Sequence, residues 1–586
     1  MRAQSFVYLA FVAMLAACGV APSTSETADQ RFRAYSKATL DEMWREFPDF
    51  GVRMGNYEYA AELVVPDQAR RSRTRAFYQR QLAALAAFDP ATLDATNRID
   101  YSVMKNRFEH GIWGIDTFKA WQWDPSTYNV ANTIDLVLTT EYAPVETRLR
   151  NAAGRLERIP AYYAAAKANI ADPTLEHTQL AILQNKGALA VLGPDLEKQV
   201  QASSLSDAEK ADFRRKVAGA RAAVEDYLAY LGEMESKLRS GKARSFRIGS
   251  VLYEQKFRYD IQSGFSAEQL YRLAMAEKAA KHDAMEKIAR ELWPKYMGTV
   301  QMPADRLLMI KLVIGEISKY HVRPEAFVET VRGQIAGLQA FVREKDLVDQ
   351  DSTRPLIVRE TPVYMRGIAG ASISAPGPLN PTANTYYNVT PLDPAKVTEN
   401  ESFLREYNDW TLQILNIHEA VPGHYTQLVH ANKSKSLVTA VFANGSMIEG
   451  WAVFGEKVML DAGYGNNAPE MWLMWMKWNL RSVMNTILDY EIQTKNLERE
   501  AAMSYMTREA FQEQTEAVEK WRRATLSQVQ LTSYFNGYAE ITALRDEMRA
   551  KQGSAFSVKG FNNRFLSYGN APIRSIREVM LSETRP

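Results

Sequence analysis

Apolar and polar residues alternate with a helical period over most of the chain. Residues 204–238 place Ala, Leu, Val and Tyr at helical spacing between charged residues. Residues 266–293 begin with Ser-Ala-Glu-Gln, a capping-box pattern that predicts the start of a second helix. Residues 324–347 form a third run, which opens with a proline at a first-turn position. The pattern therefore predicts a mainly helical protein.

The pattern changes between residues 355 and 391. Residues 356–361 and 385–390 are rich in β-branched or aromatic residues and predict two strands. The Gly- and Pro-rich stretch 370–384 between them predicts a loop. Helical spacing resumes near Glu401 and continues to the C-terminus. We expect one mainly helical body with a small β-sheet insert.

The first 33 residues have the features of an export signal and a tether. The apolar run 6–17 is too short to span a bilayer as a mature helix, and it ends directly before Cys18 and Gly19. This junction resembles a bacterial lipobox, in which the cysteine is lipidated; an ordinary signal peptide with a coincidental cysteine is the alternative. The resemblance implies a signal peptide at 1–17, a lipidated Cys18 with a flexible tether at 18–33, and an exported lipoprotein. Glycine rather than aspartate after the cysteine resembles the outer-membrane class, facing the periplasm or the cell surface.

Composition narrows the chemistry of the mature chain. Cys18 is the single cysteine, so the lipidated protein has no disulfide and no cysteine nucleophile. Of the 586 residues, 46% are hydrophobic and 24% are charged, and the net charge is +2. This balance is typical of an ordinary globular protein and gives no electrostatic case for nucleic-acid binding.

Three of the seven histidines cluster at His418, His424 and His430. Glu419 follows the first, as in zinc hydrolases whose helical His-Glu pair is joined by a second histidine four residues later. Here the second histidine comes six residues later, and on a regular helix the two rings would point roughly apart. A break at the intervening Pro-Gly pair would return His424 to the same side. The alternative is a buried core histidine beside a surface acid, and we interpret His430 as an ordinary helix residue.

A catalytic zinc ion needs a third protein ligand and an open coordination position. The best candidate is Glu449, and Glu456 lies seven residues later on the same helical face, where it is expected to hold a ligand in place. Ser446 and Glu449 also fit a capping box, which would make Glu449 a helix-start residue; the two roles are compatible. The Met and Trp stripe at 471–478 is interpreted as core.

The segment His-Glu-x-x-Pro-Gly-His at 418–424, followed by Glu-Gly-Trp-Ala at 449–452, resembles the bacterial domain-of-unknown-function family 885. The likeness covers roughly residues 34–577. Further agreements are Pro48 to Gly55, Tyr386 to Val389, and Gln530-x-x-x-Tyr534-x-x-Gly537 leading into Leu544-Arg545. Family members often carry a histidine where this chain has Gln493, a departure that bears on substrate preference.

That family looks like a zincin-type metallopeptidase. The resemblance implies a mainly α fold, a large helical zincin-like body that encloses a cleft, with the β-sheet insert next to the metal helix. It implies one zinc ion per chain, held by His418, His424 and Glu449, with Glu419 as the general base. Tyr534 is the expected donor to the oxyanion, from the resemblance and because a phenol donates without charge.

Two further features are assigned to substrate binding. The strand with Tyr386, Tyr387 and Asn388 would act as an edge strand that pairs with an extended peptide, and its alternative is a core strand whose tyrosines only pack. Arg545 would bind a substrate carboxylate, or else is a plain surface arginine.

We therefore expect an N-terminal helical region at 34–350 and a catalytic region at 351–586, with metal-binding helices at 401–462 followed by C-terminal helices. The expected function is that of a zinc-dependent metallopeptidase, carboxypeptidase- or oligopeptidase-like, that cleaves peptides in the bacterial cell envelope. A rival is a catalytically silent lipoprotein that binds peptides or envelope polymers, and a second rival is zinc hydrolysis of a non-peptide amide. The sequence does not specify an oligomeric state.

Overall fold

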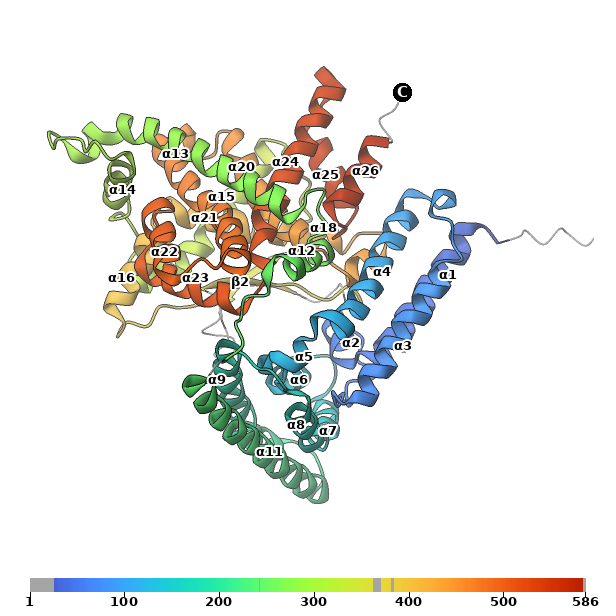
Figure 1. Ribbon diagram of the computed structural model, residues 1–586. Helices are drawn as coiled ribbons and strands as arrows, with labels where there is room; N and C mark the ends of the chain where they lie inside the picture. Colours follow the sequence, from blue (N-terminus) through green and yellow to red (C-terminus); the bar gives the residue numbers. More distant parts are fainter. Residues whose placement is uncertain (1–25, 242, 362–369, 381–383, 583–586) are drawn as a thin grey trace, which may run out of the picture.

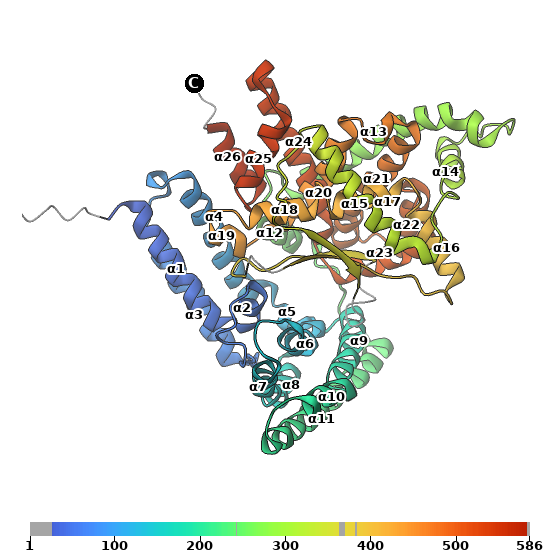
Figure 2. The same cartoon turned by 180° about the vertical axis from the view of Figure 1, so that it is seen from behind.

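The computed structural model describes residues 26–241, 243–361, 370–380 and 384–582. The fold is mainly helical, as predicted, with one three-stranded sheet (Figures 1 and 2). The expected signal peptide and Cys18 lie outside the described residues. Within the described ranges, no helix is both long and apolar enough to cross a membrane.

Buried side chains form two hydrophobic clusters, which divide the molecule into a body and an arm. The cluster in the body contains residues from before and after residue 350, the expected boundary between two regions. In addition, α4 contacts α19 and α26, which both follow that boundary. The arm, α5 to α11, has its own core and extends from the body (Figure 1). The arm helices are α5 (Ala120–Trp123), α6 (Ala131–Thr139), α7 (Val145–Leu156), α8 (Ile159–Asn169), α9 (Leu175–Val191), α10 (Pro194–Ala202) and α11 (Asp207–Ser240).

The helices of the body come from both ends of the chain. Those before the β insert are α1 (Ala28–Glu46), α2 (Pro48–Met54), α3 (Gln68–Leu85), α4 (Ala95–Trp113), α12 (Gly249–Asp260), α13 (Ala267–Met297), α14 (Arg306–Ile317) and α15 (Phe327–Glu344). Those after it are α16 (Val397–Glu406), α17 (Thr411–Glu419), α18 (His424–Ala431), α19 (Leu437–Val441), α20 (Gly445–Asp461), α21 (Pro469–Thr494), α22 (Arg499–Ser504), α23 (Gln514–Leu526), α24 (Ser533–Gln552), α25 (Val558–Ser567) and α26 (Ile573–Ser582).

Local chemistry sets where the long helices begin. Ser266 caps α13, and its hydroxyl accepts from the Gln269 N–H while the Gln269 side chain accepts from the Ser266 N–H, as the capping box predicted. The same reciprocal pair, Ser206 and Glu209, starts α11. Each box satisfies N–H groups that a helix start otherwise leaves without partners.

The sheet contains both predicted strands and one that was not predicted. β1 (Leu356–Glu360) runs parallel to β3 (Thr385–Val389), and β2 (Ala371–Ser374) pairs antiparallel with the other edge of β3, so the strand order is β1-β3-β2. β2 lies inside the stretch predicted to be a loop, because only one of its four residues, Ile373, favours a strand. A hydrogen bond joins the sheet to α17: the Tyr387 hydroxyl donates to Oδ1 of Asn416 (2.7 Å).

Candidate metal centre and cleft

The predicted break in the histidine segment separates two helices. α17 ends at Glu419, and α18 begins at His424. The Gly423 N–H donates to the Ile417 carbonyl oxygen (3.0 Å), and a Cβ at Gly423 would overlap the carbonyl oxygen of His418. Only glycine allows the chain to turn this tightly. The turn brings the rings of His418 and His424 to 4.8 Å between centroids, nearly perpendicular to each other.

Glu449 joins these histidines from α20. Its Oε2 lies 3.8 Å from Nε2 of His418 and 3.5 Å from Nε2 of His424. Two ligand atoms of a tetrahedral zinc ion, each about 2.0–2.2 Å from the metal, lie about 3.3–3.5 Å apart. The two separations from the carboxylate oxygen are therefore close to those that a zinc site requires. Glu419 also approaches, since one ligand atom each of His418, Glu419 and His424 lie within 4.8 Å of one another, but the shorter distances favour Glu449 as the third ligand.

The capping-box alternative for Glu449 is wrong. Asn444 caps α20 by accepting from the Met447 N–H (2.9 Å). Ser446 instead lies inside the helix, and its hydroxyl donates to the carbonyl oxygen of Ser533 at the start of α24 (3.2 Å). The carboxylate of Glu449 therefore has no part in starting α20 and faces the two histidines.

Glu456 fixes the orientation of His418. This role was predicted from its position seven residues after Glu449, on the same face of the helix. Its fully buried carboxylate accepts from Nδ1 of His418 (2.7 Å) and from the indole N–H groups of Trp475 (3.1 Å) and Trp478 (2.9 Å). With Nδ1 engaged, Nε2 of His418 is the nitrogen left to face Glu449, the arrangement that carboxylates give to metal-binding histidines. The Met and Trp stripe is largely core, as interpreted, and two of its three indoles also donate to Glu456.

The electrostatics of the cluster favour a positive charge between the rings. Burial disfavours the charged ring of His418, but the hydrogen bond to Glu456 and the nearby carboxylates outweigh it and raise its pKa to about 9. Burial raises the pKa of Glu419 above its usual range. Burial would also raise the pKa of Glu449, but its contact with His424 lowers that pKa on balance. A cation at this point would meet carboxylates on more than one side.

Close packing of α20 against α24 places Tyr534 in the cleft that His418 and Glu419 line. A Cβ on Gly537 would overlap the carbonyl oxygen of Ser446 and the Cα of Gly450, so both glycines are needed where the two helices touch. Tyr534 is one turn before Gly537, lines the same cleft as His418 and Glu419, and its pKa is raised by burial and by the charge of Glu449. The glycine of the Tyr534-x-x-Gly537 motif therefore has a packing role.

We expect Gly537→Ala to lower the free energy of unfolding by about 1–3 kcal/mol, because the added methyl group forces α24 away from α20. The matched control is Gly333→Ala on α15, where an added Cβ meets no atom within 4 Å of the described structure. That substitution should be neutral or stabilising by up to about 1 kcal/mol, since alanine favours a helix. Chemical unfolding followed by circular dichroism measures both, and equal effects would contradict the proposed helix contact.

His418 and Glu419 line a cleft of about 830 Å³. Its walls come from β2, α17, α21, α23 and α24, and Leu180 of the arm also reaches it. Besides His418, Glu419 and Tyr534, its polar and charged lining residues are Thr390, Tyr407, Arg481, Ser482, Asn485, Glu516, Glu519, Lys520, Arg522, Arg523 and Ser527.

One wall of the cleft carries a network of charges that the sequence analysis missed. Arg481 bridges Glu406 (3.3 Å) and Glu516 (2.5 Å), while Lys477 contacts Glu406 (2.7 Å) and Lys520 lies 3.9 Å from Glu516. Burial, with the neighbouring Arg481, lowers the pKa of Lys520 to about 7. Spacings of four residues within α21 and α23 were visible in the sequence, but pairing between α16, α21 and α23 was not.

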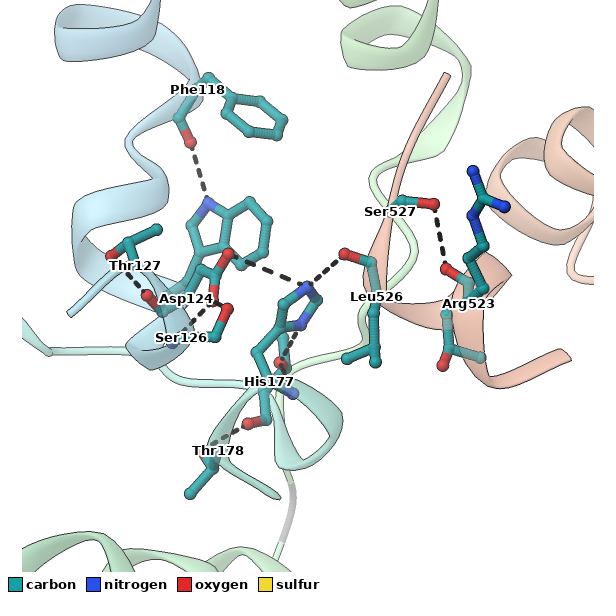
Figure 3. Close-up of polar contacts among 12 residues, drawn as sticks. Phe118, Asp124, Ser126, Thr127, His177, Thr178, Arg523, Leu526 and Ser527 are labelled. Atoms are coloured by element: carbon teal, nitrogen blue, oxygen red, sulfur yellow. Dashed lines mark hydrogen bonds and ion pairs between the residues drawn. The ribbon is translucent and has the colours of Figure 1, made fainter. Parts of the chain in front are cut away.

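The arm contacts the end of α23, the helix that carries part of this wall. His177, at the start of α9, places Nε2 3.2 Å from the carbonyl oxygen of Leu526 and Nδ1 2.7 Å from the hydroxyl of Thr174, with Asp124 4.0 Å away. Figure 3 shows the ring of His177 between Asp124, also in the arm, and Leu526 of the body. The contact is buried, so it fixes the arm against one side of the cleft.

The expected edge strand is wrong. β3 is the central strand and its backbone pairs on both sides, so it has no free edge for a peptide. Tyr387 and Asn388 are fully buried, and Asn388 bonds Arg359 (2.7 Å) and Ser374 (2.8 Å) within the sheet. Tyr386 packs against the guanidinium of Arg359. These residues form a core strand, and it is β2 that borders the cleft.

Three other residues lie away from the metal centre. Arg545 pairs with Asp546 (2.9 Å) and does not line the cleft, which contradicts its assignment to a substrate carboxylate. His430 bonds the carbonyl oxygen of Asp349 (2.9 Å), as expected of an ordinary helix residue. Gln493 is buried, donating to the carbonyl oxygen of Ala524 (3.1 Å) behind α23, so the missing family histidine does not alter the ligand set.

Solved structures of two other proteins match most of the chain, and each is described as a "putative lipoprotein". One, of unknown function and from Shewanella oneidensis, is 50% identical, with a TM-score of 0.87 over 94% of this chain and 99% of that one. The other, from Colwellia psychrerythraea, is 16% identical, with a TM-score of 0.77 over 95% of this chain and 99% of that one, and shows a shared fold. These likenesses agree with an exported lipoprotein.

No curated protein sequence matches the chain. A family model described as "Bacterial protein of unknown function (DUF885)" matches residues 48–580, nearly the whole described body and arm. The match spans the His-Glu segment, Glu449 and the Tyr534 motif alike. The chain therefore belongs to the DUF885 family of bacterial proteins.

Proposed function

We propose that the protein is a zinc-dependent hydrolase that cleaves peptide bonds, built on a zincin-like helical body. The observation that carries the proposal is the convergence of three atoms, Nε2 of His418, Nε2 of His424 and Oε2 of Glu449, at separations of 3.5 and 3.8 Å from the carboxylate. A carboxylate that is not needed as a ligand, Glu419, stands beside them at the wall of a cleft. Two imidazoles and one carboxylate, with a further acid as base, are a donor set of zinc peptidases.

Each residue has a distinct task in this proposal. His418, His424 and Glu449 would hold the ion, which when bound supplies a Lewis acid that polarises a carbonyl and makes water a nucleophile near neutral pH. Glu419 takes a proton from the attacking water and delivers it to the leaving amine, a task suited to a carboxylate whose pKa burial raises toward neutrality. Tyr534 donates its O–H to the oxyanion that develops on the carbonyl oxygen.

The resemblance of the N-terminus to a lipobox and the lipoprotein relatives support a proposal for the location. We propose that the lipid on Cys18 anchors the protein in the outer membrane, with the body in the periplasm or at the cell surface. The substrates would then be peptides of the cell envelope. Cell fractionation tests the anchor, since Cys18→Ala should release the protein from the membrane fraction.

The metal content of the chain that begins after Cys18 tests the proposal. We expect about one zinc per chain by plasma mass spectrometry, and almost none in His424→Ala, because two ligands hold the ion far more weakly than three. His430→Ala is the matched control, since this histidine lies on the same helix but faces Asp349, and it should keep the zinc. Absence of metal in all three proteins after incubation with zinc would favour the silent binding lipoprotein.

A further inference from the structure

The cleft contains one arginine that has no carboxylate oxygen within 4 Å among the described residues. Arg481, Lys520 and Arg522 each have a carboxylate oxygen within 4 Å. Arg523, on the same wall, has none among the described residues, and it is exposed to the cleft. An arginine in a substrate cleft that lacks an acidic partner is available to bind a carboxylate of the ligand, with its planar fork of N–H donors.

Arg523 is held toward the catalytic groups by two uncharged acceptors. Its Nη2 donates to Oε1 of Gln530 (2.8 Å) and to the hydroxyl oxygen of Tyr534 (3.3 Å). The structure described gives no partner to Nε or Nη1, so these donors remain for a ligand. The same cleft is lined by His418 and Glu419. Gln530 and Tyr534 therefore fix the arginine beside the candidate metal centre.

We infer that Arg523 binds the C-terminal carboxylate of a peptide substrate, and that the protein removes single residues from that end. The inference rests on the proposed function. Tyr534 would serve the oxyanion with its O–H while its oxygen accepts from Arg523, only 3.3 Å away. Because Tyr534 would contact both the oxyanion and Arg523, a carboxylate on Arg523 would lie close to the cleaved bond, which favours the last peptide link.

The reaction is a hydrolysis that consumes one water. The C–N bond of the last peptide link breaks, the water oxygen joins the carbonyl carbon, and its proton passes through Glu419 to the leaving amine. The products are the shortened peptide with a new carboxyl group and a free amino acid. The arginine takes no part in the bond changes; it sets which bond lies at the metal centre.

Paired peptides test this inference. The zinc-loaded protein is given an N-acetylated pentapeptide with a free C-terminus and the same peptide with a C-terminal amide, and the products are identified by mass spectrometry. We expect release of the last amino acid, with kcat/KM about 10–100-fold higher for the acid, as a charge-assisted pair with the carboxylate implies. Arg523→Gln should bring the acid-to-amide ratio close to one.

Arg522→Gln is the matched control, because this neighbouring arginine also lines the cleft but lies near Glu519 (3.8 Å). It should leave the acid-to-amide ratio unchanged. Equal cleavage of both peptides, or internal cleavage with an unchanged ratio in Arg523→Gln, would overturn the inference and leave the hydrolase proposal standing. Cleavage of neither peptide by the zinc-loaded protein would overturn the hydrolase proposal and, with it, the carboxypeptidase.

Binding gives a reading that does not depend on turnover. In Glu419→Gln loaded with zinc, calorimetry should show the acid peptide binding about 10–100-fold more tightly than the amide. Adding Arg523→Gln should remove the difference. A preference that survives this second substitution would place the carboxylate elsewhere and overturn the role of Arg523.

Discussion

Glu419→Gln is expected to lower kcat for peptide hydrolysis by a factor on the order of 10²–10⁴ while zinc content stays the same. The amide keeps the size and the hydrogen-bonding capacity of the side chain but cannot take a proton from water. The three atoms proposed to bind the metal belong to other residues, so the ion should remain. Peptide cleavage by mass spectrometry, measured beside the zinc content of each preparation, separates loss of the base from loss of the metal.

The control for this change is Glu401→Gln, which removes a carboxylate from the exposed surface of α16. It should leave both activity and zinc content as in the native protein. If Glu419→Gln lost its zinc, Glu419 would have to be a ligand, as its approach to within 4.8 Å of the histidines allows. If it kept both zinc and full activity, the base would be another residue and the mechanism proposed would be wrong.

Short-range patterns predicted the local structure well because local chemistry decides it. The Ser266 capping box, the two β-branched or aromatic strands and the break before His424 each depend on neighbours within about six residues. β2 was missed because a segment of four residues, three of them small, pairs as a strand only when β3 is already beside it. β3 is central only because β2 pairs with it. Since β2 was not predicted, β3 was wrongly expected to be an edge strand.

The residues of the candidate site also fall into two groups. Some could be predicted from nearby residues, and others depend on how distant segments pack. The two histidines and Glu419 lie within seven residues, and their chemistry could be read from spacing together with the resemblance. The choice of Arg545 was wrong and Arg523 was overlooked, since which arginine enters the cleft depends on how α23 and α24 pack. No spacing rule links Arg523 with Gln530 and Tyr534, because the link passes through the turn that joins the two helices.

Glu456→Leu should lower both the stability of the protein and its affinity for zinc. The carboxylate accepts from His418, Trp475 and Trp478 and is fully buried, so leucine leaves three N–H donors, two of them buried, without this acceptor. Breaking a buried, hydrogen-bonded charged group typically costs about 3–5 kcal/mol of unfolding free energy. Loss of the partner that orients a metal-binding histidine lowers metal affinity about 10–100-fold. Chemical unfolding and competition with a zinc-binding dye measure the two effects.

Glu470→Leu separates the two effects. Glu470 is also buried on α21 and accepts from Lys295 (2.5 Å) and Tyr296 (3.1 Å), but neither partner belongs to the metal centre. This control should therefore lower stability without changing zinc affinity. A Glu456→Leu protein that is destabilised yet binds zinc as tightly as the native one would show that Glu456 serves only as a core acceptor for the two tryptophans. The orientation of Nε2 of His418 would then have to come from the turn at Gly423 alone.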